Sequence, residues 1–165
     1  MNLLTRIRIG AQAGVLAGLI VAGTFFLADL ARLEPLSTPL AFSSGFLGPG
    51  GLSIDSPYLM QGLVIVSFGG RLAAFSVLHM TVFTALGIGA VLTCRACGLP
   101  LNALTAGVFG LVACSLVFYA GAWVTDAASV VELPALRTIL LVNLLAGVVM
   151  GAYYDVAVKR ARATA

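Results

Sequence analysis

Apolar residues run almost without interruption through four segments of the chain, at about residues 9–30, 72–93, 103–125 and 138–158. Each segment has roughly the 20 residues that a transmembrane α-helix needs to cross the hydrocarbon core of a bilayer. Gly, Pro and charged residues gather in the breaks, where they end helices and form turns. The pattern predicts an all-α integral membrane protein whose four transmembrane helices form a single membrane domain over residues 1–165.

The segment between the first two predicted spans, about residues 31–71, is long and is itself apolar. Its prolines and Gly-Gly pairs argue against one continuous helix. Pro57 follows Asp55 and Ser56 at a favourable first helical position, and Gly69 and Gly70 are expected to end that helix. We therefore predict a long apolar outer loop with a short helix that lies along the outer interface or re-enters the membrane.

Irregular apolar backbone at membrane depth is tolerated only where protein covers it. The favoured interpretation is that a partner subunit covers this loop, while a mobile loop that rests on lipid headgroups is the alternative. We expect the partner to contact four large apolar side chains of the loop, Phe42, Phe46, Leu47 and Tyr58.

Charged residues are scarce, at 9% against 61% hydrophobic residues, and this balance excludes an ordinary soluble domain. With the N-terminus in the cytoplasm, six of the nine basic side chains fall on the inner side: Arg6, Arg8, Arg95, Lys159, Arg160 and Arg162. This distribution follows the positive-inside rule and predicts that both termini are cytoplasmic. The expected location is a bacterial inner (cytoplasmic) membrane.

Small residues recur at every fourth position of the first span, as Gly10, Gly14 and Gly18. Helices in lipid gain no hydrophobic stabilisation from meeting each other, so they rely on close backbone packing at such ridges. We expect the ridge to pack against another helix of this chain or of a neighbouring subunit. The same spacing occurs in two other spans, as Asn143, Gly147, Gly151 and as Thr81, Ala85, Gly89.

His79 is the only histidine, and it lies about 12 Å below the outer end of the second span if each residue rises 1.5 Å. An ionisable side chain at that depth indicates a functional site by default. Phe75 and Phe83 share its helical face, away from the small residues of that span. One hypothesis is therefore that His79 is the axial ligand of a haem or chlorophyll-type macrocycle held between these two rings.

Two other interpretations of His79 remain open. The imidazole could contact another subunit, or it could be structural and form interhelical hydrogen bonds with Thr24, Ser115 or Asn143, which fall in the same layer. The Cys94-x-x-Cys97 pair has no second half, so no zinc or redox site is expected there.

Every charged residue falls at a span end or in a loop, so no charged relay crosses the predicted membrane core. Motifs of hydrolases, metalloproteases and nucleotide-binding proteins are absent from the sequence, and the basic residues are too scattered for nucleic acid. We therefore expect a protein that is not an enzyme and that contacts other membrane subunits and membrane lipid.

The function that these features favour is that of an accessory, structural transmembrane subunit of a larger membrane complex, for example an energy-converting complex of respiration or photosynthesis. It would act through helix packing and outer-loop contacts and would require no cofactor. One alternative is an electron-transfer or light-harvesting subunit with a macrocycle at His79, and a second is a small oligomeric transporter or channel.

Overall fold

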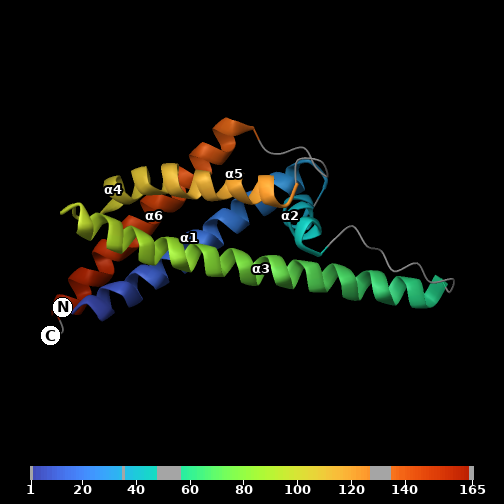
Figure 1. Ribbon diagram of the computed structural model, residues 1–165, viewed down its shortest axis with the longest axis horizontal. Helices are drawn as coiled ribbons and strands as arrows, with labels where there is room; N and C mark the ends of the chain where they lie inside the picture. Colours follow the sequence, from blue (N-terminus) through green and yellow to red (C-terminus); the bar gives the residue numbers. More distant parts are fainter. Residues whose placement is uncertain (1, 35, 48–56, 127–134, 164–165) are drawn as a thin grey trace.

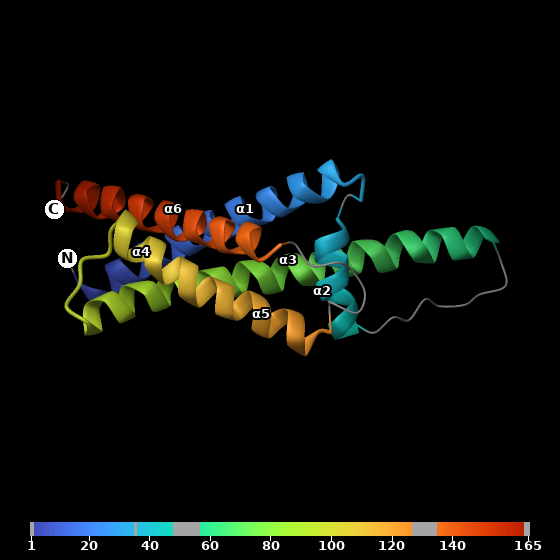
Figure 2. The ribbon, with the colours of Figure 1, turned by 90° about the horizontal axis from the view of Figure 1, so that it is seen from above.

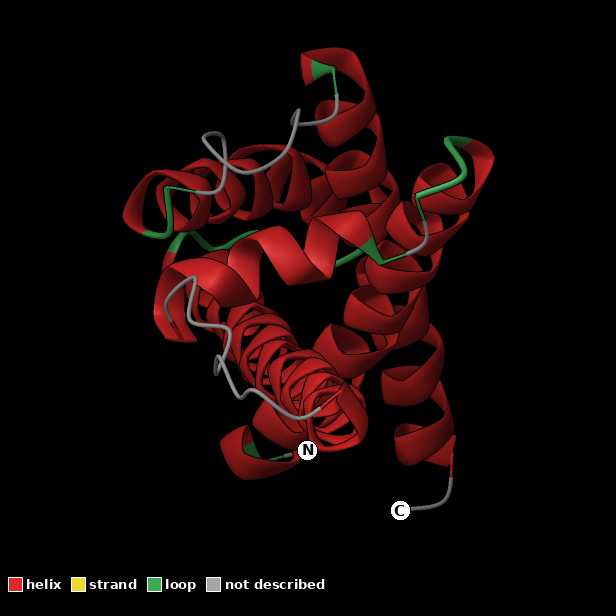
Figure 3. Ribbon diagram, turned by 90° about the vertical axis from the view of Figure 1, so that its right-hand side faces the viewer, coloured by secondary structure: helices red, strands yellow, loops and turns green. Residues whose placement is uncertain are grey.

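The computed structural model describes residues 2–34, 36–47, 57–126 and 135–163, with side chains for all of these except residues 41, 44–47 and 57–68. These residues form helices and short loops, and Figure 3 shows no strand among them. The helices, in chain order, are α1 (Leu3–Ala31), α2 (Ser37–Leu47), α3 (Pro57–Ala96), α4 (Ala103–Phe109), the π-helical turn η1 (Gly110–Cys114), α5 (Ser115–Val124) and α6 (Leu136–Ala163).

In the part of the chain that the structure describes, four helical stretches are long and apolar enough to cross a membrane, namely Leu3–Ala31, Gly69–Ala96, Ala103–Val124 and Leu136–Ala163. The all-α fold and the four predicted spans are thus confirmed. Large apolar side chains face outward from the bundle, with Leu116 and Trp123 70% and 84% exposed. Such a surface suits lipid and is unsuited to water.

The long helices form a bundle in which α1 is central. α1 packs against both α3 and α6, and α6 packs in turn against α4 and η1. Both chain termini lie at one end of the bundle together with the turn between α3 and α4, whereas α2 lies toward the other end (Figure 1). Figure 2 shows that α2 runs across the direction of the long helices.

α1 and α3 approach each other so closely that side chains at the contact would collide with backbone. A Cβ at Gly14 would meet the carbonyl oxygen of Phe83, and a Cβ at Gly10 would lie 2.9 Å from the carbonyl oxygen of Gly87. A Cβ at Gly18 would lie 2.9 Å from the Phe83 Cβ. The ridge of Gly10, Gly14 and Gly18 therefore packs within the chain, and close backbone packing of this kind stabilises helix pairs in lipid.

A second glycine contact joins α6 to the α4–η1 segment. A Cβ at Gly110 would lie 2.7 Å from the Gly147 Cα, and a Cβ at Gly151 would lie 2.7 Å from the Ala106 Cβ. A Cβ at Gly147 would itself meet the carbonyl oxygen of Ala106. Each of the two helical hairpins is thus held by a contact that has no room for side chains.

The third small-residue run does not form a helix contact. Thr81 and Ala85 are exposed, and a Cβ at Gly89 would come no closer than 3.8 Å to a neighbouring atom. The face of α3 that meets α1 instead carries Phe83 and Gly87. The spacing of small residues did not identify this contact face, because a large residue, Phe83, occupies one of its positions.

The predicted break at Gly69 and Gly70 is wrong, because α3 continues without interruption from Pro57 to Ala96. Glycine destabilises a helix by about 1 kcal/mol per residue but, unlike proline, keeps the N–H that the helix needs. The helix does begin at Pro57, as the sequence predicts. The short helix of this region is instead α2, in which Pro39 occupies a position in the first turn, where its missing N–H costs little.

Two alanine substitutions on α1 test the glycine contact. Gly14→Ala should lower the free energy of unfolding by about 1–3 kcal/mol, because the new methyl group overpacks against α3 backbone that cannot move aside. Gly23→Ala is the matched control, since no atom lies within 4 Å of a Cβ there. The control should be neutral or stabilising by up to about 1 kcal/mol, because alanine favours helix.

Unfolding of both variants in mild detergent, followed by circular dichroism, measures this difference. Equal stability of the two variants would contradict the close approach of α1 to α3.

Candidate functional site

A small cavity lies between α1, α2, α3 and α5, in the half of the bundle near α2. Its volume is about 130 Å³ and its walls are almost entirely apolar. Its lining includes the polar residues His79 and Asn143, and Thr38 lies at its α2 side. The rings that line it come from all four helices: Phe25, Phe42, Phe75, Phe83 and Phe118.

These rings form a continuous chain of aromatic contacts around the cavity. Phe25 stacks on Phe118 at 5.7 Å between ring centroids, and Phe118 meets the edge of Phe42 at 5.4 Å. Phe42 lies 6.2 Å from Phe75, so this ring of α2 bridges α5 and α3. Aromatic pairs at such distances contribute about 0.5–1.5 kcal/mol each beyond the area they bury.

The imidazole of His79 completes this chain. Its ring centroid lies 5.5 Å from that of Phe75 and 4.7 Å from that of Phe83. Its Nε2 is 2.9 Å from the carbonyl oxygen of Gly18 on α1. Because a carbonyl oxygen only accepts, Nε2 carries the proton and donates, which leaves Nδ1 of the neutral ring as an acceptor.

The partner of His79 differs from the partners that the sequence suggested. Thr24 donates its hydroxyl to the Ile20 carbonyl within α1, and the Asn143 side chain donates to Ser115. His79 lies away from Thr81, Ala85 and Gly89, as expected, but the face of α3 that packs against α1 is the one that carries His79 and not that small-residue run. His79 is one turn from Phe83 on that face, and the absence of a side chain at Gly18 lets the imidazole reach the α1 backbone.

A second interhelical hydrogen bond involves Asn143, another lining residue of the cavity. Asn143 Nδ2 on α6 donates to Ser115 Oγ at 3.0 Å, and the two residues are 2% and 7% exposed. Ser115 directly follows the π-helical turn η1, whose extra backbone residue shifts the helix register at this position. This bond ties α5 to α6 where the glycine contact between α6 and η1 ends.

A buried carboxylate holds α2 in place. Asp29, at the end of α1, is 3% exposed and accepts hydrogen bonds from the backbone N–H of Thr38 at 2.9 Å and from its hydroxyl at 2.8 Å. A negative charge at a helix N-terminus is stabilised by the free N–H groups there. Asp29 thereby fixes α2 in the position from which Phe42 contacts Phe75 and Phe118.

The sequence places Asp29 at a span end without assigning it this role. The sequence Ser37-Thr38-Pro39 is typical of a helix start and follows closely after Asp29, the last acidic residue of the first span. This pattern could have indicated that Asp29 binds the N-terminus of a second helix.

The structure brings Phe75, His79 and Phe83 together but leaves no gap between the two phenylalanines. The imidazole itself fills that space, and a cavity of about 130 Å³ is similar in size to the ~150 Å³ cavities that hold benzene. A small apolar molecule fits this space, whereas a macrocycle does not fit between these rings as they stand. Among the described residues, no three His, Cys, Asp or Glu side chains lie close enough to hold a metal ion.

Of the four expected partner-contact residues, Phe42 lies against its own chain, because its ring packs on α3 and α5. The side chains of Phe46, Leu47 and Tyr58 lie outside the described residues.

Comparison of the chain with protein-family models, curated proteins and solved structures gives no match.

Replacing Asp29 tests how α2 is held. Asp29→Ala should lower the free energy of unfolding by about 1–3 kcal/mol, because it leaves a buried N–H and a buried hydroxyl of Thr38 without their acceptor. Asp155→Ala is the control, since Asp155 forms an exposed pair with Lys159. Such pairs contribute about 0.5 kcal/mol or less. Equal effects of the two substitutions in detergent unfolding experiments would show that Asp29 does not hold α2.

Proposed function

We propose that this protein is an accessory, structural subunit of a larger membrane complex, with both termini in the cytoplasm. The observation that carries the proposal is the length of α3. Its 40 residues correspond to about 60 Å of helix, twice the roughly 30 Å of hydrocarbon in a bilayer. The N-terminal part of α3 extends well past the ends of the other helices (Figures 1 and 2).

This projecting part of α3, residues 57–70, is referred to below as the α3 extension. Its sequence contains no Asp, Glu, Lys or Arg. A contiguous uncharged apolar segment that stands away from its own chain is typical of a surface that another protein covers. A second membrane subunit that packs along the α3 extension on the outer face would provide that cover.

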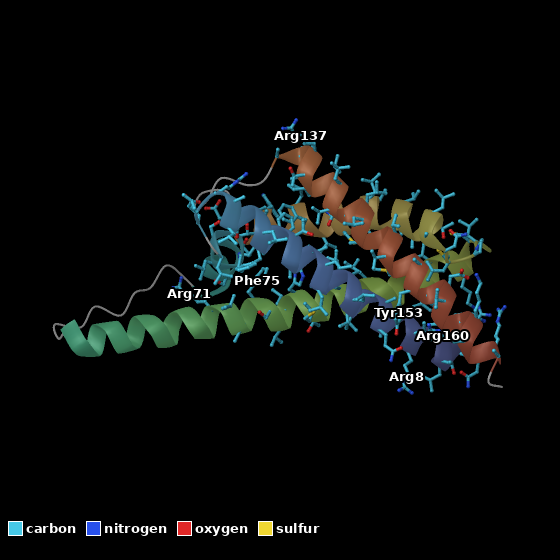
Figure 4. All side chains as sticks on the ribbon, turned by 180° about the vertical axis from the view of Figure 1, so that it is seen from behind. Arg8, Arg71, Phe75, Arg137, Tyr153 and Arg160 are labelled. Atoms are coloured by element: carbon cyan, nitrogen blue, oxygen red, sulfur yellow. The ribbon has the colours of Figure 1, made fainter. Side chains whose placement is uncertain are left out.

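The charges at the two ends of the bundle support the orientation. Arg8 and Arg160 lie at the end that holds both termini, and Arg71 and Arg137 lie at the other end (Figure 4). Of the nine basic residues of the chain, six lie at the terminal end and three, which include Arg32 just after α1, lie toward the opposite end. The positive-inside rule places the richer end in the cytoplasm.

The polar groups inside the bundle support a structural role over a transport role. Asp29, His79 and Asn143 each have a hydrogen-bond partner within the chain. In the described part of the chain no buried side-chain nitrogen or oxygen lacks such a partner. Transport routes, by contrast, are lined by polar groups available to the substrate.

A cofactor-binding role at His79 is the second candidate, because the cavity places an imidazole in an apolar pocket. Ligation of a haem or chlorophyll-type ring there would require the rings of Phe75 and Phe83 to move off the imidazole, or Nε2 to leave Gly18. We therefore expect the purified protein to show no Soret or red absorbance band. A band that disappears in His79→Leu would favour the cofactor role.

Site-specific photocrosslinking in native membranes tests the subunit role. A photoreactive amino acid at Leu63, in the α3 extension, should give one discrete crosslinked band that contains a second polypeptide. The same amino acid at Leu145, which is 47% exposed on α6, is the control and should crosslink mainly to lipid.

The steady-state level of the crosslinked polypeptide should also fall when this chain is deleted, because subunits of a complex stabilise each other. A chain that gives no protein adduct from the α3 extension, or that runs as a monomer after gentle extraction, would contradict the subunit role.

A further inference from the structure

A second hollow of the bundle lies between α1 and α6, at the end that holds the termini. Its volume is about 770 Å³, within the range of pockets that hold small molecules. The α1 wall includes Arg8, Gln12 and Leu16, and the α6 wall includes Val149, Tyr153 and Arg160. This hollow is called the α1–α6 groove below, and it is distinct from the cavity at His79.

The α1–α6 groove changes from polar to apolar along its length. The lining positions on each helix recur at intervals of three and four residues, so each wall is one helical face. Arg8 and Arg160 lie at the terminal end of the two faces, and Figure 4 shows them at the same end of the molecule, near Tyr153. Leu16 and Val149 lie about 12 Å and 16 Å deeper, at 1.5 Å per residue.

Polar side chains lie at the transition between the two zones. The Tyr153 hydroxyl donates to the Gln12 side-chain oxygen at 3.5 Å, which links the two walls. This bond uses the oxygen of the Gln12 amide, so the NH₂ group of that amide is not engaged in it. From its mouth inward the groove is thus lined by two arginines, then by a glutamine and a tyrosine, and then by apolar side chains.

We propose that the α1–α6 groove binds one anionic glycerophospholipid of the adjacent leaflet. Two arginines on different helices provide charge and planar donor pairs that match a phosphate. The amide donor lies where the glycerol esters would be, and the trough accepts part of an acyl chain. Basic hollows between transmembrane helices bind anionic headgroups in this way.

The proposal does not rest on the subunit role, because a lipid in this groove would also bind an isolated chain. It excludes free phosphate as the natural ligand, because the apolar trough contributes nothing to phosphate binding.

Native mass spectrometry of the full chain in uncharged detergent, titrated with phosphatidylglycerol or phosphatidylcholine, tests the proposal. Phosphatidylglycerol should bind at a single tight site, and phosphatidylcholine should bind more weakly. Arg8→Gln and Arg160→Gln should each weaken phosphatidylglycerol binding about fivefold, the effect of one basic residue near an anionic surface. Arg95→Gln is the matched control, because it removes one charge at the same end without touching the groove, and it should leave binding unchanged.

A steric variant keeps both arginines and blocks the trough. Ala152→Trp, on the groove wall, should abolish tight binding, while Ala85→Trp on an exposed face of α3 should not. Unfolding of each variant without added lipid verifies that the helices still form.

Three results would overturn the proposal. The first is equal binding of the two lipids, and the second is an equal loss from Arg95→Gln, which would indicate general surface charge. The third is displacement of phosphatidylglycerol by millimolar inorganic phosphate alone, which would indicate a simple anion site.

Discussion

The structure depends on one constraint, which is that helices in lipid gain little from meeting unless their backbones come very close. Gly10, Gly14 and Gly18 meet this constraint on α1, where Gly87 and the backbone of Phe83 contact them directly. The same approach brings the Gly18 carbonyl within reach of the His79 imidazole. Helix packing and the polar site of the bundle therefore have a common origin in the absence of side chains on one face of α1.

The two ends of the bundle are therefore packed by different kinds of residue. Toward the termini, glycine contacts bring the helices together and leave the α1–α6 groove open at the surface. Toward α2 the helices separate, and aromatic rings fill the wider space around a residual cavity. Asp29 makes this possible, because its carboxylate fixes α2 across the bundle and so positions the Phe42 ring. The α3 extension continues beyond this layer, and its apolar sequence is the feature that most favours a partner.

Hydropathy predicts the four spans because their apolar runs match the thickness of a bilayer, and small-residue spacing singles out the glycine ridges of α1 and α6. Other features depend on tertiary context that spacing does not encode. Phe83 takes part in a backbone contact although it is large. His79 is hydrogen-bonded to a main-chain carbonyl, and no residue type in the sequence indicates such a partner. Gly69 and Gly70 were expected to end a helix, but the backbone bonds of α3 continue through them.

The most direct test of close backbone packing is the distance between glycines of facing helices in the two hairpins. A Cβ at Gly87 would lie 2.8 Å from the Gly14 Cα, so the two Cα atoms are within about 4.5 Å of each other. Solid-state NMR of protein labelled with ¹³Cα-glycine in lipid bilayers should show a strong Gly14–Gly87 cross-peak, and a second between Gly110 and Gly147. Helices whose axes are held about 10 Å apart by side chains have facing Cα atoms more than about 5 Å apart, which weakens such a cross-peak. The absence of both cross-peaks in a folded sample would contradict the account.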